Sequence, residues 1–152
     1  MNNRNQAGIT MIEIVMVMAV IATLAAIAYP SYSEYQRKSR RVDCQSVLFQ
    51  FANAMERFYT ENNSYVGAAA GGATTGAPAI FPTSCPIDPL KDGKTYYTLT
   101  ISSATDASYT LLATATGTQF NDKCGNLSLN QDKVKGVTGS GVSIKECWLV
   151  DN

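Results

Sequence analysis

Hydrophobic positions follow three different patterns along the chain. From Ile9 to Tyr29 the residues are apolar almost without interruption. From Pro30 to about Glu61 apolar residues recur at steps of three and four, a spacing that predicts an α-helix with one apolar stripe. That stripe consists of Cys44, Leu48, Phe51, Met55 and Phe58. Beyond residue 94, apolar and polar residues alternate in short runs, which is typical of strands with one buried face.

The apolar run of 21 residues is long enough to cross a membrane. A helix rises about 1.5 Å per residue, so the run would span roughly 30 Å, the thickness of a bilayer's hydrocarbon core. A cleaved secretory signal is the alternative interpretation. The run is longer than the apolar part of such signals, and no small-x-small cleavage pattern follows before the polar "SYSEYQRKSRR". We therefore expect a retained membrane helix.

Glu13 is the one charged residue in this run. A carboxylate inside a membrane helix costs roughly 2.5–3.5 kcal/mol on insertion scales, so such groups are usually paired or functional. One interpretation is that Glu13 lies near the helix end, where the cost is lower. The other is that it pairs with a cation at the same depth, which the chain supplies only if it is cut just before Ile9 to free an α-amine.

Three strand-like runs occupy the second half of the chain. They are "TYYTLTIS" (95–102), "SYTLLATAT" (108–116) and "GNLSLNQ" (125–131), the first two joined by a short hairpin connection at 104–107. One apolar face per strand predicts an antiparallel sheet covered on one side, and the stripe of the helix is the only large apolar surface available to cover it. The fold class is therefore α+β, a long helix packed on a small antiparallel β-sheet. Residues 66–94 lack periodicity, and "GAAAGGATTGAP" within them predicts a flexible, exposed loop.

Composition excludes several kinds of site. The chain has twelve basic and twelve acidic residues and no His, so a His-based metal site or catalytic triad cannot form within it. "GGATTG" lacks the Lys of a phosphate-binding loop, and no CxxC pair indicates a zinc ribbon. We expect no enzyme activity, no cofactor and no metal. The four cysteines are even in number, which predicts two disulfides in an oxidising compartment, with three connectivities open.

The N-terminal residues resemble a known signal. A short polar leader ending in Gly8, then "ITMIE", then an apolar helix ending "AAIAYPSY", resembles the type III signal of type IV pilins and pseudopilins. The resemblance implies that a prepilin peptidase cuts between Gly8 and Ile9 and methylates the new amine. It implies that Glu13 is the glutamate required for assembly, neutralising the amine of a neighbouring subunit, and that Pro30 kinks the helix. The chain departs from the family in having Ile9 where Phe is usual and Ala22 where Gly is frequent.

The C-terminal residues carry a second resemblance. "CGNLSLNQDKVKGVTGSGVSIKECW" (124–148) is similar to the disulfide-bounded end region of type IVa pilins, particularly PilE-like minor pilins. On that match Cys124 pairs with Cys147, which leaves Cys44 with Cys85. The position of Cys44 on the apolar stripe, facing the globular part, supports the second pair.

Together the resemblances imply an organisation and a location. We expect a leader at 1–8, a transmembrane and polymerisation helix at 9–30, and a periplasmic head at 31–152. The chain would cross the inner membrane once, with its head in the periplasm, and later join a cell-surface pilus. Its partners would be the lipid bilayer, prepilin peptidase, the inner-membrane assembly platform, and other pilins in a helical filament.

The basic run "RKSRR" (37–41) after the apolar helix conflicts with this orientation. The positive-inside rule would place it in the cytoplasm, whereas the cysteines and the family place it outside, and we follow the latter. We interpret the run as a solvated collar. An alternative is that the run contacts phospholipid headgroups or a neighbouring subunit. Binding of nucleic acid by the run is the least favoured interpretation.

The function implied is that of a structural subunit of a type IV pilus, most consistent with a minor pilin and with roles in filament assembly, twitching motility and cell adhesion. A major pilin and a type II secretion pseudopilin are the nearest alternatives. A pilus-borne DNA receptor for transformation is another, although residues 42–152 carry seven basic and ten acidic side chains. Its candidate phosphate contacts are Lys123, Lys133, Lys135 and Lys145. A membrane-anchored periplasmic protein that never polymerises is a further alternative.

Overall fold

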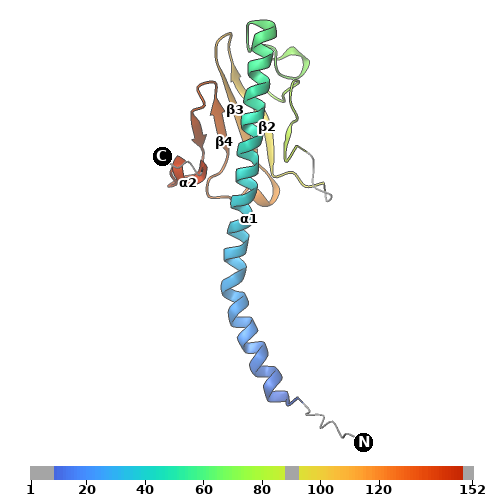
Figure 1. The fold of residues 1–152 in the computed structure, drawn as a ribbon, viewed down its shortest axis with the longest axis vertical. Helices are drawn as coiled ribbons and strands as arrows, with labels where there is room; N and C mark the ends of the chain where they lie inside the picture. Colours follow the sequence, from blue (N-terminus) through green and yellow to red (C-terminus); the bar gives the residue numbers. More distant parts are fainter. Residues whose placement is uncertain (1–8, 88–92, 149–152) are drawn as a thin grey trace, which may run out of the picture. The chain divides into compact units, whose positions relative to one another are not determined.

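The computed structural model describes residues 9–87 and 93–148, apart from the side chains of Pro30 and Ser31. The chain forms two compact units, Met1–Gln36 and Arg37–Asn152, and the helix α1 contributes to both. Figure 1 shows the elements in the colours of the sequence. They are α1 (Met11–Asn62), η1 (Ala70–Gly72), β1 (Ser84–Cys85), β2 (Tyr97–Ala104), β3 (Tyr109–Ala115), η2 (Gly117–Gln119), β4 (Leu127–Asn130), β5 (Lys135–Val137) and α2 (Ile144–Trp148).

The first unit is the apolar part of α1. Within the described residues, α1 is the one helix long and apolar enough to cross a membrane, and its apolar stretch is not buried in the protein. Large apolar side chains such as Ile12, Val15 and Leu24 are more than half exposed. The helix continues through Pro30 without interruption, and the kink expected there stays a prediction.

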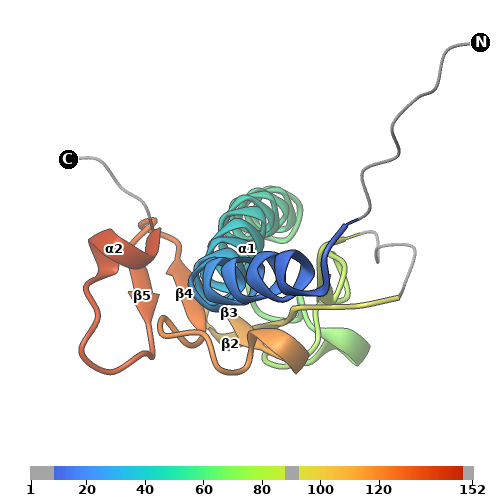
Figure 2. The ribbon, with the colours of Figure 1, turned by 90° about the horizontal axis from the view of Figure 1, so that it is seen from below.

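The second unit is a helix laid on an antiparallel sheet, as the alternating pattern predicted. The strands follow the order β1-β2-β3-β4-β5, and each pairs with the next in antiparallel register. Figures 1 and 2 show the second half of α1 lying across one face of this sheet. The strands direct toward α1 a set of fully buried side chains: Tyr97, Leu99, Ile101, Leu111, Ala113, Leu127 and Leu129.

The apolar stripe of α1 meets this face as predicted. Cys44, Leu48, Phe51 and Met55 have no exposed surface, and Phe58, at the end of the stripe, is partly buried against the same core. Burying a large apolar side chain stabilises a fold by about 1.5–3 kcal/mol, so this stripe is a main source of the head's stability. The helix ends at Asn62, one residue beyond the predicted end.

The expectation of an exposed loop after the helix holds only in part, since residues 70–73 are exposed but the two residues before them are not. Ala68 and Ala69 are only 0% and 1% exposed. Gly76 and Ile101 exchange two backbone hydrogen bonds of 2.9 and 2.8 Å, which attach the segment to the edge of β2. The segment is ordered by its main chain, because its small side chains let two stretches of backbone approach each other, and composition alone does not reveal such pairing.

Two short elements at the other edge of the sheet were not predicted. β5 has three residues and α2 has five, so neither is long enough to show a periodic pattern. The indole Nε1 of Trp148 in α2 donates a hydrogen bond of 3.1 Å to the carbonyl of Gly136 in β5. This bond and the disulfide described below hold α2 beside the edge strand (Figure 2).

Candidate functional site

A disulfide closes the C-terminal region. Cys124 and Cys147 are bonded, with their Cα atoms 5.7 Å apart, which confirms this predicted pair. The side-chain amide of Gln45 on α1 donates a 2.7 Å hydrogen bond to the Cys147 carbonyl, so the disulfide is anchored to the helix. Gly139 passes so close to the Lys123 carbonyl that a Cβ there would collide with it. The region is therefore a packed structure and not a free loop.

The second predicted bridge, Cys44–Cys85, is not formed in the structure. Both cysteines are free thiols, and both are buried. They lie close enough to hydrogen-bond, and burial raises the pKa of the Cys44 thiol far above its usual range. The prediction paired two residues that are neighbours in the structure, but the structure holds them as thiols.

The candidate phosphate contacts gather around α2 and β5. Lys123 and Glu146 form an ion pair of 2.5 Å with both side chains about half exposed, and Lys123 lowers the pKa of Glu146. Lys135 lies over the rings of Phe49 and Trp148, at 5.8 and 5.7 Å.

The other two candidate lysines extend into solvent. Lys133 lies in the turn between β4 and β5, where its φ is +59°, and Lys145 lies in α2. Both are exposed. Of the four candidates, these two are therefore best placed to contact a large anionic ligand.

A buried ion pair was missed by the sequence analysis. Arg41 in α1 contacts both carboxylate oxygens of Asp122 at 2.5 and 2.8 Å, and the two residues are only 2% and 6% exposed. The hydroxyl of Tyr97 donates to Asp122 at 3.3 Å, and the Gln119 amide donates to the same carboxylate at 3.1 Å. Burial, and then the charge of Asp122, raise the pKa of Tyr97 above its usual range. A run of charge in sequence gives no signal that one member has a buried partner 81 residues away.

The interpretation of 37–41 as a solvated collar is therefore wrong for its arginines. Arg40 stacks over the Tyr96 ring at 4.2 Å and donates to Thr118 Oγ1 at 3.0 Å. Arg37 reaches the Asn121 carbonyl at 3.4 Å. With Arg41, they attach the segment after β3 to α1. Among the charged residues of the run, Lys38 alone matches the expectation, since its side chain is exposed.

A group of phenols surrounds Glu56 near the end of α1. The hydroxyls of Tyr65 and Tyr109 each donate to its carboxylate at 3.0 Å. Burial, and then the bond to Glu56, raise the pKa of Tyr65 to about 12, so the phenol stays a hydrogen-bond donor at neutral pH. The group ties the helix end to β3 and to the segment after α1.

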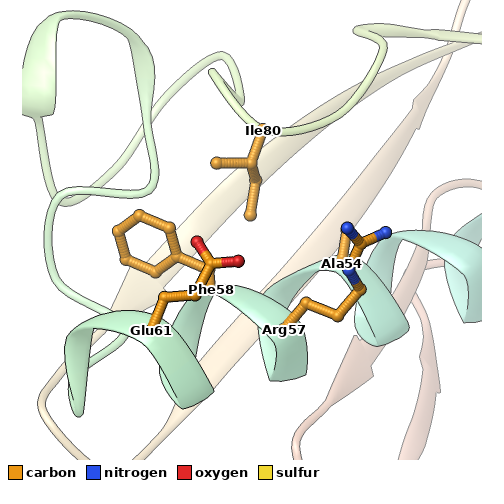
Figure 3. A pocket seen from close by; sticks show the side chains of 5 residues that line it. All are labelled: Ala54, Arg57, Phe58, Glu61 and Ile80. Carbon is orange, nitrogen blue, oxygen red and sulfur yellow. The ribbon is translucent and has the colours of Figure 1, made fainter.

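Figure 3 shows a shallow pocket between α1 and the segment before β1. Its volume is about 160 Å³. Ala54, Phe58 and Ile80 form an apolar lining, and Arg57 and Glu61 flank it with opposite charges. The pocket presents no nucleophile, and within the described residues no group of His, Cys, Asp or Glu could hold a metal ion.

Glu13 lies in the first turn of α1, in the other unit. Glu13 lines an open hollow of about 300 Å³ together with Ile9, Ile14, Val17 and Met18. A negative charge at a helix N-terminus is favoured by the helix dipole. Gly8 lies outside the described residues, as does the side chain of Pro30.

Comparison with known proteins identifies the head. The family described as type IV minor pilin ComP, DNA uptake sequence receptor, matches residues 30–128. The chain belongs to this family. The prokaryotic N-terminal methylation motif matches residues 3–29, immediately before the ComP-family head. The main functional prediction, a type IV minor pilin, is thereby confirmed.

Two solved structures are similar to this chain. One is the Neisseria meningitidis non-core minor pilin PilV, at 19% identity over 73% of this chain and 95% of that one, with a TM-score of 0.49. The other is a type IV pilin from Shewanella oneidensis, at 26% identity over 70% of this chain and 94% of that one, with a TM-score of 0.42. No curated protein matches the sequence.

Proposed function

We propose that this minor pilin is cut between Gly8 and Ile9, methylated on the new amine, and held in a type IV pilus by the first part of α1. The leader would be 1–8, the membrane and polymerisation helix 9–30, and the periplasmic head 31–152. Before assembly the protein would be anchored in the inner membrane, where prepilin peptidase and the assembly platform act on it. The methylation motif over 3–29 supports this scheme.

One observation carries the proposal, the exposure of an apolar helix that contains one carboxylate. From Ile9 to Tyr29 every residue is exposed, and large side chains such as Met11 and Ile27 are 86% and 75% exposed. Water is an unfavourable solvent for such a surface, so the helix belongs in lipid or against other helices of its kind. In either environment Glu13 needs a cation, and the free amine of a processed neighbour supplies one.

Replacing Glu13 tests this pairing. In Glu13→Ala and in the isosteric Glu13→Gln, we expect normal processing and loss of the protein from sheared pili, because the amine of the neighbour has no partner. Immunoblots of membrane and pilus fractions measure both outcomes. As the matched control, Thr10→Ala leaves the charge intact and should assemble.

Two results would contradict the scheme. Glu13→Gln protein at wild-type levels in pili would show that the carboxylate is not needed for assembly. Failure of cleavage in the Glu13 variants would also count against pairing, since it would explain their absence from pili by processing alone. Changing Gly8 to a bulkier residue should leave the longer precursor in the membrane.

DNA binding is the second candidate function, supported by the description of the family as a DNA uptake sequence receptor. The exposed Lys133 and Lys145 belong to the β4–β5 turn and α2, which the Cys124–Cys147 disulfide holds at one edge of the sheet. Lys123 is engaged by Glu146, so a phosphate would have to compete for it. DNA binding through such contacts depends on salt, with a slope of about −0.9 per phosphate neutralised.

We expect Lys133→Gln combined with Lys145→Gln to reduce that slope by about 2, because two phosphate contacts are lost. The measurement is fluorescence anisotropy of a labelled DNA duplex titrated with the full chain in detergent micelles, at several salt concentrations. Lys38→Gln, which removes an exposed charge outside this region, is the control and should leave the slope unchanged. Equal slopes for the double variant and the wild type would exclude these lysines as the contact surface.

A further inference from the structure

The head exposes an aromatic ring beside its basic run. Phe120, which follows η2, is 74% exposed, the most of any large apolar side chain described in the second unit. Arg37 and Arg40 of α1 bond Asn121 and Thr118, on either side of this ring, and the exposed Lys38 lies between them in the helix sequence. We call Phe120, Arg37, Lys38 and Arg40 the basic-aromatic collar.

The exposure of Phe120 is imposed by its surroundings. Arg40 bonds Thr118 on one side of it, and Arg37 bonds the carbonyl of Asn121 on the other. The buried Gln119, immediately before Phe120, donates to the main-chain carbonyl of Arg37 at 3.1 Å. A segment attached to the helix on both sides of the ring therefore presents it to solvent.

The charges of the collar are predominantly positive. The nearest acidic residue on the loop, Asp122, is buried and neutralised by Arg41. On α1 the flanking acidic residues are Glu34 and the exposed Asp43. An exposed aromatic ring whose chain neighbours are bonded by two arginines suits the interface of an anionic bilayer, where aromatic rings lie at headgroup depth and cations contact phosphates.

We propose that, before assembly, the collar docks on the surface of an anionic membrane, with the Phe120 ring among the headgroups and Arg37 and Lys38 at lipid phosphates. This rests on the membrane anchoring proposed above. Arg37 is eight positions after Tyr29, the last residue of the apolar run. Eight residues span about 12 Å as a helix, close to the Debye length at physiological salt, so the tether keeps the collar within the field of the lipid charges.

This chain length also favours lipid over nucleic acid as the occupant. A collar held this close to the bilayer meets headgroups at high local concentration, whereas DNA would have to enter the same narrow space against the repulsion of anionic lipid. Docking would hold the head on the membrane until extraction into a filament pulls the collar away.

The full chain reconstituted in vesicles tests the proposal with Phe120→Trp as a probe. The only native tryptophan, Trp148, is 4% exposed and gives a constant background. In vesicles with anionic lipid we expect the emission of F120W to shift to shorter wavelength, to be quenched by lipids brominated near the headgroup, and to be protected from acrylamide. In neutral vesicles the protection should be weak.

Charge removal provides the matched comparison. Lys38→Gln in the F120W background removes an exposed charge that makes no hydrogen bond or ion pair to residues 37–87 or 93–148. It should lower the ratio of docked to undocked heads about fivefold, since each cation near an anionic surface contributes about 1 kcal/mol. Lys145→Gln, in α2, is the control and should leave that ratio unchanged. The Cys124–Cys147 disulfide reports on folding. If Lys38→Gln lowers docking while this disulfide stays intact, misfolding is excluded as the cause.

Three outcomes would overturn the proposal. The first is equal protection of F120W in neutral and anionic vesicles, and the second is protection that Lys38→Gln does not change. The third is release of the probe from anionic vesicles by a DNA duplex, which would assign the collar to nucleic acid. Flotation of the chain with vesicles reports separately on anchoring by α1, so a floating chain with an unprotected probe rejects docking alone, and a chain that does not float rejects both.

Discussion

At the scale of single residues, the run from Arg37 to Arg41 shows how one charge pattern can serve several purposes. Arg41 is buried with Asp122, Arg40 stacks on Tyr96, and only Lys38 has the exposed position that a charge run suggests. These arginines are part of the head's tertiary structure, which is a reason, independent of membrane topology, for basic residues to follow the apolar helix.

The Arg41–Asp122 pair gives a prediction at this scale. Asp122→Ala should destabilise the head by about 3–5 kcal/mol, because the Arg41 charge would stay buried without a partner. Arg41→Met combined with Asp122→Leu should recover much of that loss, since both buried charges are removed together. Urea unfolding followed by Trp148 fluorescence measures both. If Asp122→Ala alone were as stable as wild type, the Arg41–Asp122 pair would not stabilise the attachment of the segment after β3 to α1.

At the scale of elements, predictability followed side-chain periodicity. The stripe from Cys44 to Met55 and the alternation in β2, β3 and β4 each come from a buried face, so the sequence carries them directly. β1, β5, α2 and the segment from Ala68 to Pro78 are held by main-chain hydrogen bonds, a disulfide and one indole contact. These interactions join residues far apart in sequence and leave no periodic trace. For that reason β1, β5 and α2 were not predicted, and the buried part of the segment after α1 was not foreseen.

The candidate sites divide in the same way. The motif around Glu13 is local in sequence and could be recognised there, and the match of the methylation motif supports that recognition. The candidate lysines could be named but not ranked, because the partners of Lys123 and Lys135 come from distant elements. The collar could not be assembled at all from sequence, since Phe120 and Arg37 are brought together only by the fold.

At the scale of the whole molecule, two cysteine pairs lie at opposite edges of the sheet, and only one of them is bonded. Cys124–Cys147 closes the β4–β5 and α2 edge, and Cys44 and Cys85 join α1 to β1 at the other, where they are free thiols. A second bridge would close a loop of 41 residues and stabilise the head by about 4 kcal/mol in the loop-entropy model. We expect that bridge to close slowly in the folded head, because both thiols are buried and burial raises the pKa of the Cys44 thiol.

We therefore predict that the Cys44–Cys85 bridge depends on when the chain meets an oxidant. Protein exported before folding should carry both disulfides, whereas protein folded with reduced cysteines should keep Cys44 and Cys85 as thiols after exposure to air, since their burial prevents attack. Intact mass spectrometry after alkylation under denaturing conditions distinguishes the two, and the same spectrum shows whether the mature chain begins at a methylated Ile9. Cys85→Ser should lower the stability of the exported protein toward that of the reduced form. If alkylation labelled Cys44 and Cys85 in protein from pili, the second bridge would play no part in the assembled subunit, and the stability of that edge would rest on packing around β1 alone.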